Sequence, residues 1–385
     1  MGKLNFVEGA RGFAALIVVF QHLALIFYPT LYTGDSVTAH YSPDLEFFLA
    51  TTPFNIFYNG NFAVCVFFVL SGFVLSNKYF LNPSISILID YSLKRYFRLL
   101  IPAAFSAIFA FLMLYVFKPD FFITESVTNA GPWLKGLFAD KPGCFDFVYT
   151  MFIDVFINGN NKYNPVLWTM GVEFLGSLLL FAVLALTHVI VNKNKMFILI
   201  ISVLFIFKLH FYAAFFIGSL ICYNYQKSDK SLNKFVTLSL LIIGVYFASY
   251  PTSWQYMNQS IYKPFLWLQM DFMNYALVIG SGILFYLLTK SILFQKLLSN
   301  AFFKLLGKIS FSMYLIHLVI LITVTRYLFH YFLLSHSYNI SCLIACSISI
   351  PIIFLCAYIV YLFIDKPSIS ISNYLGKRLS EIINT

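Results

Sequence analysis

Apolar stretches long enough to cross a lipid bilayer recur along the whole of this 385-residue sequence. A hydrocarbon core about 30 Å thick takes roughly 20 helical residues to cross, and lipid offers no partner to unpaired backbone groups. The composition agrees, because 60% of the residues are hydrophobic and 10% are charged, against about 25% charged residues in soluble domains. We therefore predict an all-α, polytopic membrane protein, and an ordinary soluble fold is excluded.

Breaks rich in Pro, Gly, Asn and Lys divide the apolar sequence into about ten predicted transmembrane helices. The fifth and sixth are the least distinct, because Lys208 and His210 interrupt one apolar region that could form two short helices or one long helix. We expect residues 1–385 to form a single integral membrane domain, with the first span retained and not cleaved as a signal peptide. The predicted spans are 12–28, 62–77, 99–117, 166–190, 196–207, 209–225, 235–250, 265–289, 309–333 and 340–364.

The distribution of charge predicts the orientation of these spans. A net charge of +10 would suggest nucleic acid as the partner of a soluble protein. If the first helix runs outward, however, the cytoplasmic segments collect 18 of the 25 Lys and Arg residues, which is the positive-inside bias. An even number of spans then leaves both termini in the cytoplasm, and the lipid bilayer replaces nucleic acid as the expected partner. The long connections 29–61 and 118–165 fall on the outer side.

Arg11 and His22 stand eleven residues apart in the first predicted span. At about 100° per residue they lie within about 20° of one helix face, with the His about 16 Å beyond the Arg. Charged groups inside spans cost about 2.5–3.5 kcal/mol and usually mark a pathway or a site. The alternative is an Arg that reaches the interface and a hydrogen-bonded core His. No metal site is predicted, because the cysteines show no metal-ligand spacing.

The second and third spans carry two short polar patterns. Ser71-Gly72 interrupts bulky residues, so that another helix or a ligand can approach closely. Arg95 and Arg98, three residues apart, project in neighbouring directions and can grip phosphate oxygens with their forked donors. The alternative roles are helix packing for the Ser-Gly pair and anchoring to lipid headgroups for the two arginines.

Further polar residues lie within the later spans. Glu173 is about 10 Å deep from the outer side, a depth that matches His22, so an imidazole partner is expected for this carboxylate. Asp271, Tyr314 and His317 are additional candidates for a polar pathway. Tyr314 and His317 could instead form a satisfied hydrogen-bonding pair between helices.

Taken together, these motifs resemble the acyltransferase-3 family, many members of which O-acetylate cell-surface polysaccharides. The match runs across nearly the whole chain and departs from the family pattern mildly, with Met170-Gly171 where small or polar residues with Leu are usual and Asp365 where Glu is common. The motifs are Arg11 to His22, Phe67-Phe68-x-x-Ser71-Gly72-Phe73, Arg95-x-x-Arg98, Trp168 to Glu173, Ile309 to His317, and Asp365-Lys366-Pro367.

This resemblance implies an O-acyltransferase that uses acyl-CoA, usually acetyl-CoA, as a co-substrate from the cytoplasm, without a permanently bound cofactor. The implied partner is a carbohydrate acceptor with a free hydroxyl on the far side of the membrane. A multi-pass protein of a bacterial inner membrane is the expected setting.

The resemblance also distributes roles among the candidate residues. Arg11, Arg95 and Arg98 would hold the donor phosphates with Ser71 and Gly72 nearby, which places the thioester near the catalytic pair His22 and Glu173. The His would act as general base on the acceptor hydroxyl or would carry the acyl group itself, and Glu173 would orient the imidazole.

Two other classes of function also fit parts of the sequence. A transporter or flippase of a lipid-linked sugar or acyl group would equally need many spans with buried charges, although no repeated half is evident. A structural membrane subunit explains the composition but gives no reason for charges within several helices.

Overall fold

The computed structural model describes residues 4–131, 134, 137, 143–227, 232–252, 257–268 and 271–383. The structure is 84% helical, and its described residues contain no strand. Within them, seven helical segments are long and apolar enough to cross a membrane, which confirms the helical fold and supports several membrane spans. These segments are Asn5–Phe27, Gly60–Leu81, Ile85–Phe117, Pro165–Leu186, Phe272–Lys290, Ala301–Leu333 and Tyr338–Glu381.

The three other predicted spans are also helical, namely α10 (Lys193–Ile206), α11 (His210–Lys227) and α12 (Lys234–Ala248). The ambiguous apolar region forms two helices, because Lys208 adopts a left-handed conformation with φ 58° and ends the first of them. α12 is a shorter apolar helix, so the total of ten spans stays a prediction.

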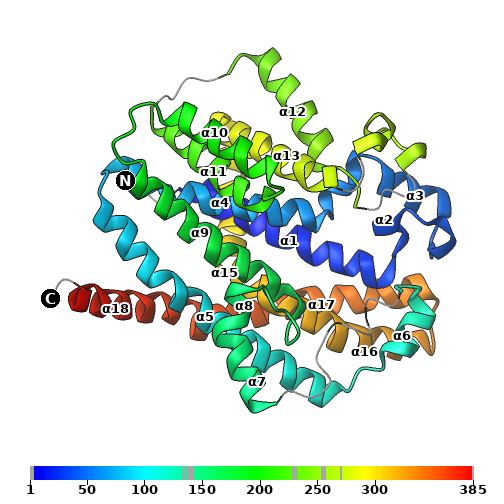
Figure 1. Ribbon diagram of the computed structural model, residues 1–385. Coiled ribbons are helices and arrows are strands. Elements are labelled where there is room, and N and C mark those ends of the chain that lie inside the picture. The colour runs from blue at the N-terminus through cyan, green and yellow to red at the C-terminus, as the bar shows by residue number, and fades with distance from the viewer. Residues whose placement is uncertain are drawn as a thin grey trace.

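Two helix pairs form the centre of the bundle. α1 (Asn5–Phe27) packs along α15 (Ala301–Ile320), and α4 (Gly60–Leu81) packs along α11. α9 (Trp168–Leu186) and α13 (Asp271–Lys290) contact α4 and α11 from further out. Figure 1 shows both chain termini at the left of the molecule, the end that we call the termini side. Their predicted location in the cytoplasm stays a prediction.

Glycine contacts set the spacing of both central pairs. A Cβ added at Gly12 would lie 2.5 Å from the backbone nitrogen of Gly307, so α1 and α15 touch backbone to backbone. In the other pair, a Cβ added at Gly72 would lie 1.9 Å from the carbonyl oxygen of Phe215, and one at Gly218 equally close to that of Val69. Small residues of this kind let membrane helices approach closely where no hydrophobic effect drives them together.

Several helices are longer than the hydrocarbon core needs. α5 (Ile85–Phe117) has 33 residues and so spans about 50 Å, and α17 (Tyr338–Val360) continues through a π-turn (Tyr361–Asp365) into α18 (Lys366–Ile383). The helix therefore continues past residue 364, the predicted end of the last span, and only its pitch changes there. The wide turn ends two residues before Pro367, whose ring would otherwise clash with the preceding helical turn. α18 packs against α5 on the termini side (Figure 1).

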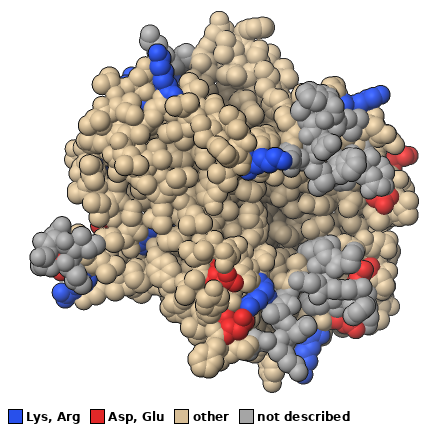
Figure 2. Space-filling model, in the orientation of Figure 1, with Lys and Arg blue, Asp and Glu red and all other residues tan. Residues whose placement is uncertain are grey.

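Short helices occupy the long connections and helix ends. On the face drawn in Figure 2, charged groups are scattered and separated by broad uncharged surface, as expected where lipid contacts the bundle. The remaining elements are α2 (Thr30–Thr33), η1 (Ser36–Thr38), α3 (Pro43–Thr51), η2 (Pro53–Phe57), α6 (Phe121–Thr128), α7 (Cys144–Tyr149), the π-turn Thr150–Asp154, α8 (Val155–Ile157), η5 (Pro165–Leu167), η6 (Met257–Gln259), η7 (Lys263–Leu268), α14 (Ile292–Leu298), the π-turn Leu321–Thr325 and α16 (Arg326–Leu333).

The backbone contact at Gly12 makes a stability prediction. Gly12→Ala should lower the free energy of unfolding by about 1–3 kcal/mol, because the added methyl group forces α1 and α15 apart. Intrinsic helix propensity favours Ala by about 1 kcal/mol, so the predicted loss opposes the local preference. Thermal unfolding of the detergent-solubilised protein measures the change. Gly143→Ala is the control, since its Cβ would meet only Asp146 at 3.7 Å, and equal behaviour of the two variants would contradict the packing argument.

Candidate functional site

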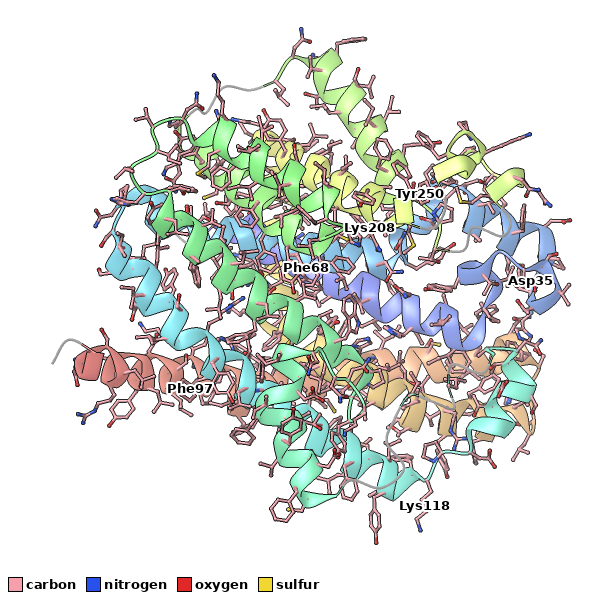
Figure 3. The ribbon with its side chains drawn as sticks, viewed as in Figure 1. Asp35, Phe68, Phe97, Lys118, Lys208 and Tyr250 are labelled. Atoms are coloured by element: carbon pink, nitrogen blue, oxygen red, sulfur yellow. The ribbon has the colours of Figure 1, made fainter. Side chains whose placement is uncertain are left out.

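A cavity of about 360 Å³ opens among α1, α4, α5, α9, α15 and the start of α18. Its volume lies at the lower end of the range for small-molecule sites, about 300–1,000 Å³. Phe68, which Figure 3 labels near the centre of the bundle, forms part of its wall. The labelled residues Asp35 and Lys118 lie far from it, at the edges of the same view. The polar residues that line the cavity are Glu8, Arg11, Ser71, Arg95, Arg98, Thr169, Glu173, Lys308, Ser310, Tyr314, Tyr361 and Asp365.

Arg95 and Glu173 form an ion pair in the wall of this cavity. Their side chains are 14% and 13% exposed, so water screens the pair only weakly. Ser71 donates a hydrogen bond of 2.7 Å to the same carboxylate, and the Nε of Arg95 donates to Ser177 at 3.0 Å. This network joins α4, α5 and α9, which fixes both charged side chains in place.

Arg98 turns toward a different helix from Arg95. It lies 2.6 Å from the carboxylate of Asp365, donates to the hydroxyl of Ser368 at 2.8 Å, and its guanidinium lies 5.3 Å from the ring centre of Phe311. The side chain of Arg98 is 25% exposed while that of Asp365 is 5% exposed. Arg98 is thus the more accessible of the two predicted phosphate ligands on α5.

The termini side of the cavity carries more positive charge. Arg11 lies 3.7 Å from Glu8, one turn earlier on α1, and the pair is about one quarter exposed. Lys308 joins them from α15, directly after the glycine that touches α1. In the sequence, Lys308 is one of the 18 basic residues of the predicted cytoplasmic segments and Asp365 is part of a motif, so neither is predicted there as a site residue. Their shared place in the cavity depends on helix packing that no spacing within one helix reveals.

His22 and His317 face each other between α1 and α15. The Nε2 of His317 lies 3.1 Å from the Nδ1 of His22, and the ring centres are 5.0 Å apart. The Nδ1 of His22 also lies 3.0 Å from the carbonyl oxygen of Val18. On the other ring, the Nδ1 of His317 lies 2.7 Å and 3.1 Å from the carbonyl oxygens of Tyr314 and Met313. His317 is fully buried.

The expected pairing of His22 with Glu173 is replaced by these other contacts in the described structure. The reason lies in the segment before α9, where Asn164 caps η5, is fully buried, and donates hydrogen bonds to the carbonyl of Leu315 at 2.8 Å and to the hydroxyl of Ser106 at 3.2 Å. α9 therefore begins inside the protein, near the level of His317. Glu173 lies several residues further toward the termini side and pairs with Arg95.

Tyr314 connects the cavity to the histidine pair. It lines the cavity, and its ring centre lies 6.0 Å from that of His317, one turn further along α15. Its hydroxyl lies 3.0 Å from that of Thr169 and donates to the carbonyl of Val166 at 3.2 Å. Among the lining residues of α15, Tyr314 is the one furthest from the termini side, so the cavity leads toward His317 and His22.

Two other predicted site residues have different outcomes. Gly72 packs against the backbone of α11 and is absent from the described cavity lining, in contrast to its neighbour Ser71. Its small size serves helix packing, which was the alternative reading of this motif. Asp271 begins α13, and its side chain lies outside the described residues.

The connection 118–165 carries carboxylates that stay ionised at neutral pH. Hydrogen bonds from Lys162 and Tyr163 lower the pKa of Asp146, and those from Asn158 and Asn160 lower the pKa of Asp154. In the described part of the chain, His, Cys, Asp and Glu side chains form no group of three that could hold a metal.

Comparison with known protein families gives a match over most of the chain. A family model described as an acyltransferase domain matches residues 4–364, which is nearly the whole chain. The searches against curated proteins and against solved structures return no significant match.

The Arg95–Glu173 pair predicts a non-additive pattern of stability. Removing one partner, as in Glu173→Leu or Arg95→Met, should cost about 3–5 kcal/mol because a buried charge is left unpaired. The double variant Arg95→Met/Glu173→Leu should be closer to the wild type than either single variant. Thermal unfolding in detergent measures all three.

An exposed ion pair provides the control for this cycle. Arg378 and Glu381 are 64% and 52% exposed, so Arg378→Met should change stability by less than about 1 kcal/mol. Additive losses in the Arg95/Glu173 double variant would contradict the interpretation of the buried pair.

Proposed function

The chain belongs to the acyltransferase family whose domain model it matches, and from this premise we propose that it moves an acyl group, most simply acetyl, from acyl-CoA to a carbohydrate hydroxyl. The family match confirms the resemblance drawn from the sequence motifs and supports acyl transfer within the membrane. The observation that carries the finer proposal is the cavity itself, which has arginines toward the termini side and is bounded at its inner end by Tyr314, one helical turn from His317.

The donor would enter from the termini side, which we assign to the cytoplasm. Coenzyme A is a polyanion at one end and a slender neutral arm at the other. Arg98, Arg11 and Lys308 supply the accessible positive charge for its phosphates, and guanidinium groups bind phosphate oxygens through paired donors. A cavity of about 360 Å³ suits the arm, with the nucleotide at the mouth. Arg95, paired with Glu173, would contribute to the electrostatic potential along this path and to the wall of the cavity.

His22 would act as the general base on the acceptor hydroxyl. The hydroxyl proton passes to the imidazole while the hydroxyl oxygen forms a bond to the thioester carbon. As the carbon–sulfur bond breaks, the departing thiolate takes that proton from the imidazole, so that the acylated carbohydrate and free coenzyme A are released. To reach His22, the thioester must part the contact between Tyr314 and Thr169 at the inner end of the cavity.

The acceptor would approach from the opposite side of the bundle. We assign the connections 29–61 and 118–165 to that side, as the charge distribution predicts, and the ionised Asp146 and Asp154 would give the second of them a polar surface. A surface polysaccharide or its precursor fits such a hydrophilic surface, and the protein would then reside in a bacterial inner membrane.

The first prediction from this proposal concerns His22. His22→Ala should abolish acyl transfer, because general base catalysis of this kind contributes about 10²–10⁴-fold to rate. The assay combines acetyl-CoA consumption by protein in lipid vesicles with mass spectrometry of glycans from cells with and without the gene. His336→Ala, at an exposed position, is the control and should stay active.

The glycan measurement also separates the competing functions. A glycan that differs by the mass of one acyl group supports transfer and identifies the acyl group. Loss of the whole glycan would favour a transporter or flippase, and an active His22→Ala protein of normal abundance would contradict the proposed mechanism.

The second prediction concerns donor affinity. Arg98→Ala should weaken the binding of free coenzyme A by about 10–100-fold, the effect of losing a charged hydrogen bond of about 1.5–3 kcal/mol. Calorimetric titration of the detergent-solubilised protein measures the dissociation constant. Lys377→Ala, exposed on α18 and outside the cavity lining, is the control. Unchanged affinity in Arg98→Ala would remove this residue from the donor site.

A further inference from the structure

We infer that His317 is a positioning residue that fixes the tautomer of His22, so that the Nε2 of His22 is the atom that accepts the proton. This inference rests on the proposed function for its chemical meaning. The tautomer itself is a property of the resting protein and can be measured without turnover.

The far nitrogen of His317, Nδ1, faces two backbone carbonyl groups. It lies 2.7 Å from the carbonyl oxygen of Tyr314 and 3.1 Å from that of Met313, and both oxygens only accept hydrogen bonds. This nitrogen therefore carries a hydrogen. Because His317 is fully buried, a charged imidazolium would be costly, and the neutral ring leaves its Nε2 with a lone pair.

The lone pair of His317 determines the proton on the second ring. The Nδ1 of His22 lies 3.1 Å from the Nε2 of His317 and 3.0 Å from the carbonyl oxygen of Val18, and both of these are acceptors. The Nδ1 of His22 must then be the donor. A neutral imidazole has one such hydrogen, so its Nε2 is left unprotonated and available as the base.

The two acceptors of His22 are not equivalent. The carbonyl of Val18 lies four residues earlier in the same helix, where it accepts the regular backbone hydrogen bond of α1. His317 comes from α15, so only this contact ties the ring orientation of His22 to the helix that also carries Tyr314. When His22 gains a proton during transfer, the same neutral acceptor stabilises the Nδ1 hydrogen without adding a buried charge.

Two substitutions of similar polarity separate positioning from packing. In His317→Gln the side-chain oxygen can reach the former Nε2 position and accept from His22. In His317→Asn the shorter amide can replace the bond from Nδ1 to Tyr314 but falls short of His22. Because Asn leaves the larger cavity, packing alone predicts a lower stability for His317→Asn than for His317→Gln but no change in the tautomer of His22. Positioning predicts in addition that the tautomer of His22 changes in His317→Asn and not in His317→Gln.

The closing experiment reads the tautomer directly. Protein labelled with ¹⁵N-histidine in micelles gives ring nitrogen shifts that distinguish the two neutral forms, and His22→Gln identifies the His22 signals by their loss. We expect the Nδ1-protonated form in the wild type and in His317→Gln, and a mixture in His317→Asn. A wild-type His22 protonated at Nε2, or one form in all three proteins, would overturn the inference even if no acyl transfer were found.

Turnover gives the second readout. In His317→Asn, kcat for acyl transfer should fall about tenfold or more while KM for acetyl-CoA stays unchanged, because the base is disturbed and the donor site is not. His317→Gln should restore most of kcat. If the two variants unfold at the same temperature and also share the same kcat, the positioning role is excluded.

Discussion

The backbone contact between Gly12 and Gly307 is the constraint on which the rest of the site depends. α1 and α15 run in the same direction from this contact, and His22 and His317 each follow their glycine by ten residues. An equal rise of about 15 Å along both helices brings the two rings to the same level. A side chain at either glycine would tilt or separate the helices. The close approach near the termini side is therefore what aligns the histidines deep in the bundle.

A second constraint applies to charge in the wall of the cavity, where both arginines of α5 are paired with carboxylates. Arg95 is held by Glu173 and Arg98 by Asp365, in pairs that link α5 to α9 and to the segment before α18. A low-dielectric interior makes an unpaired charge costly, so these pairs are the form in which arginines can line a cavity there. The polyanionic donor that we propose would bind where solvent already reaches the guanidinium, which favours Arg98 over Arg95.

Much of the fold follows from hydropathy, but the contacts between helices do not. Runs of apolar residues predict where helices lie, and the left-handed Lys208 resolves the one ambiguous region into two. The predicted pairing of Glu173 with His22 is wrong because the prediction takes α9 to begin at the outer surface, whereas the buried Asn164, which caps η5 directly before α9, lies inside the protein. Helical periodicity also places Arg11 and His22 on one face of α1 but cannot say that His317 faces them. The sequence therefore predicts the candidate residues better than their partners.

The identity of the partner of His22 has a physical consequence for chemistry in a membrane. A carboxylate beside the imidazole would have to be buried near mid-bilayer, at a cost of several kcal/mol when the imidazole is neutral. A neutral imidazole on α15 can direct the Nδ1 hydrogen without this cost, while Glu173 is balanced by Arg95 elsewhere. The neutral imidazole of His317 is a weaker hydrogen-bond acceptor than a carboxylate, because a hydrogen bond to a neutral group is about half as strong as one to an ion. Orientation, more than added basicity, is then what the second histidine supplies, and orientation is lost if α15 moves relative to α1.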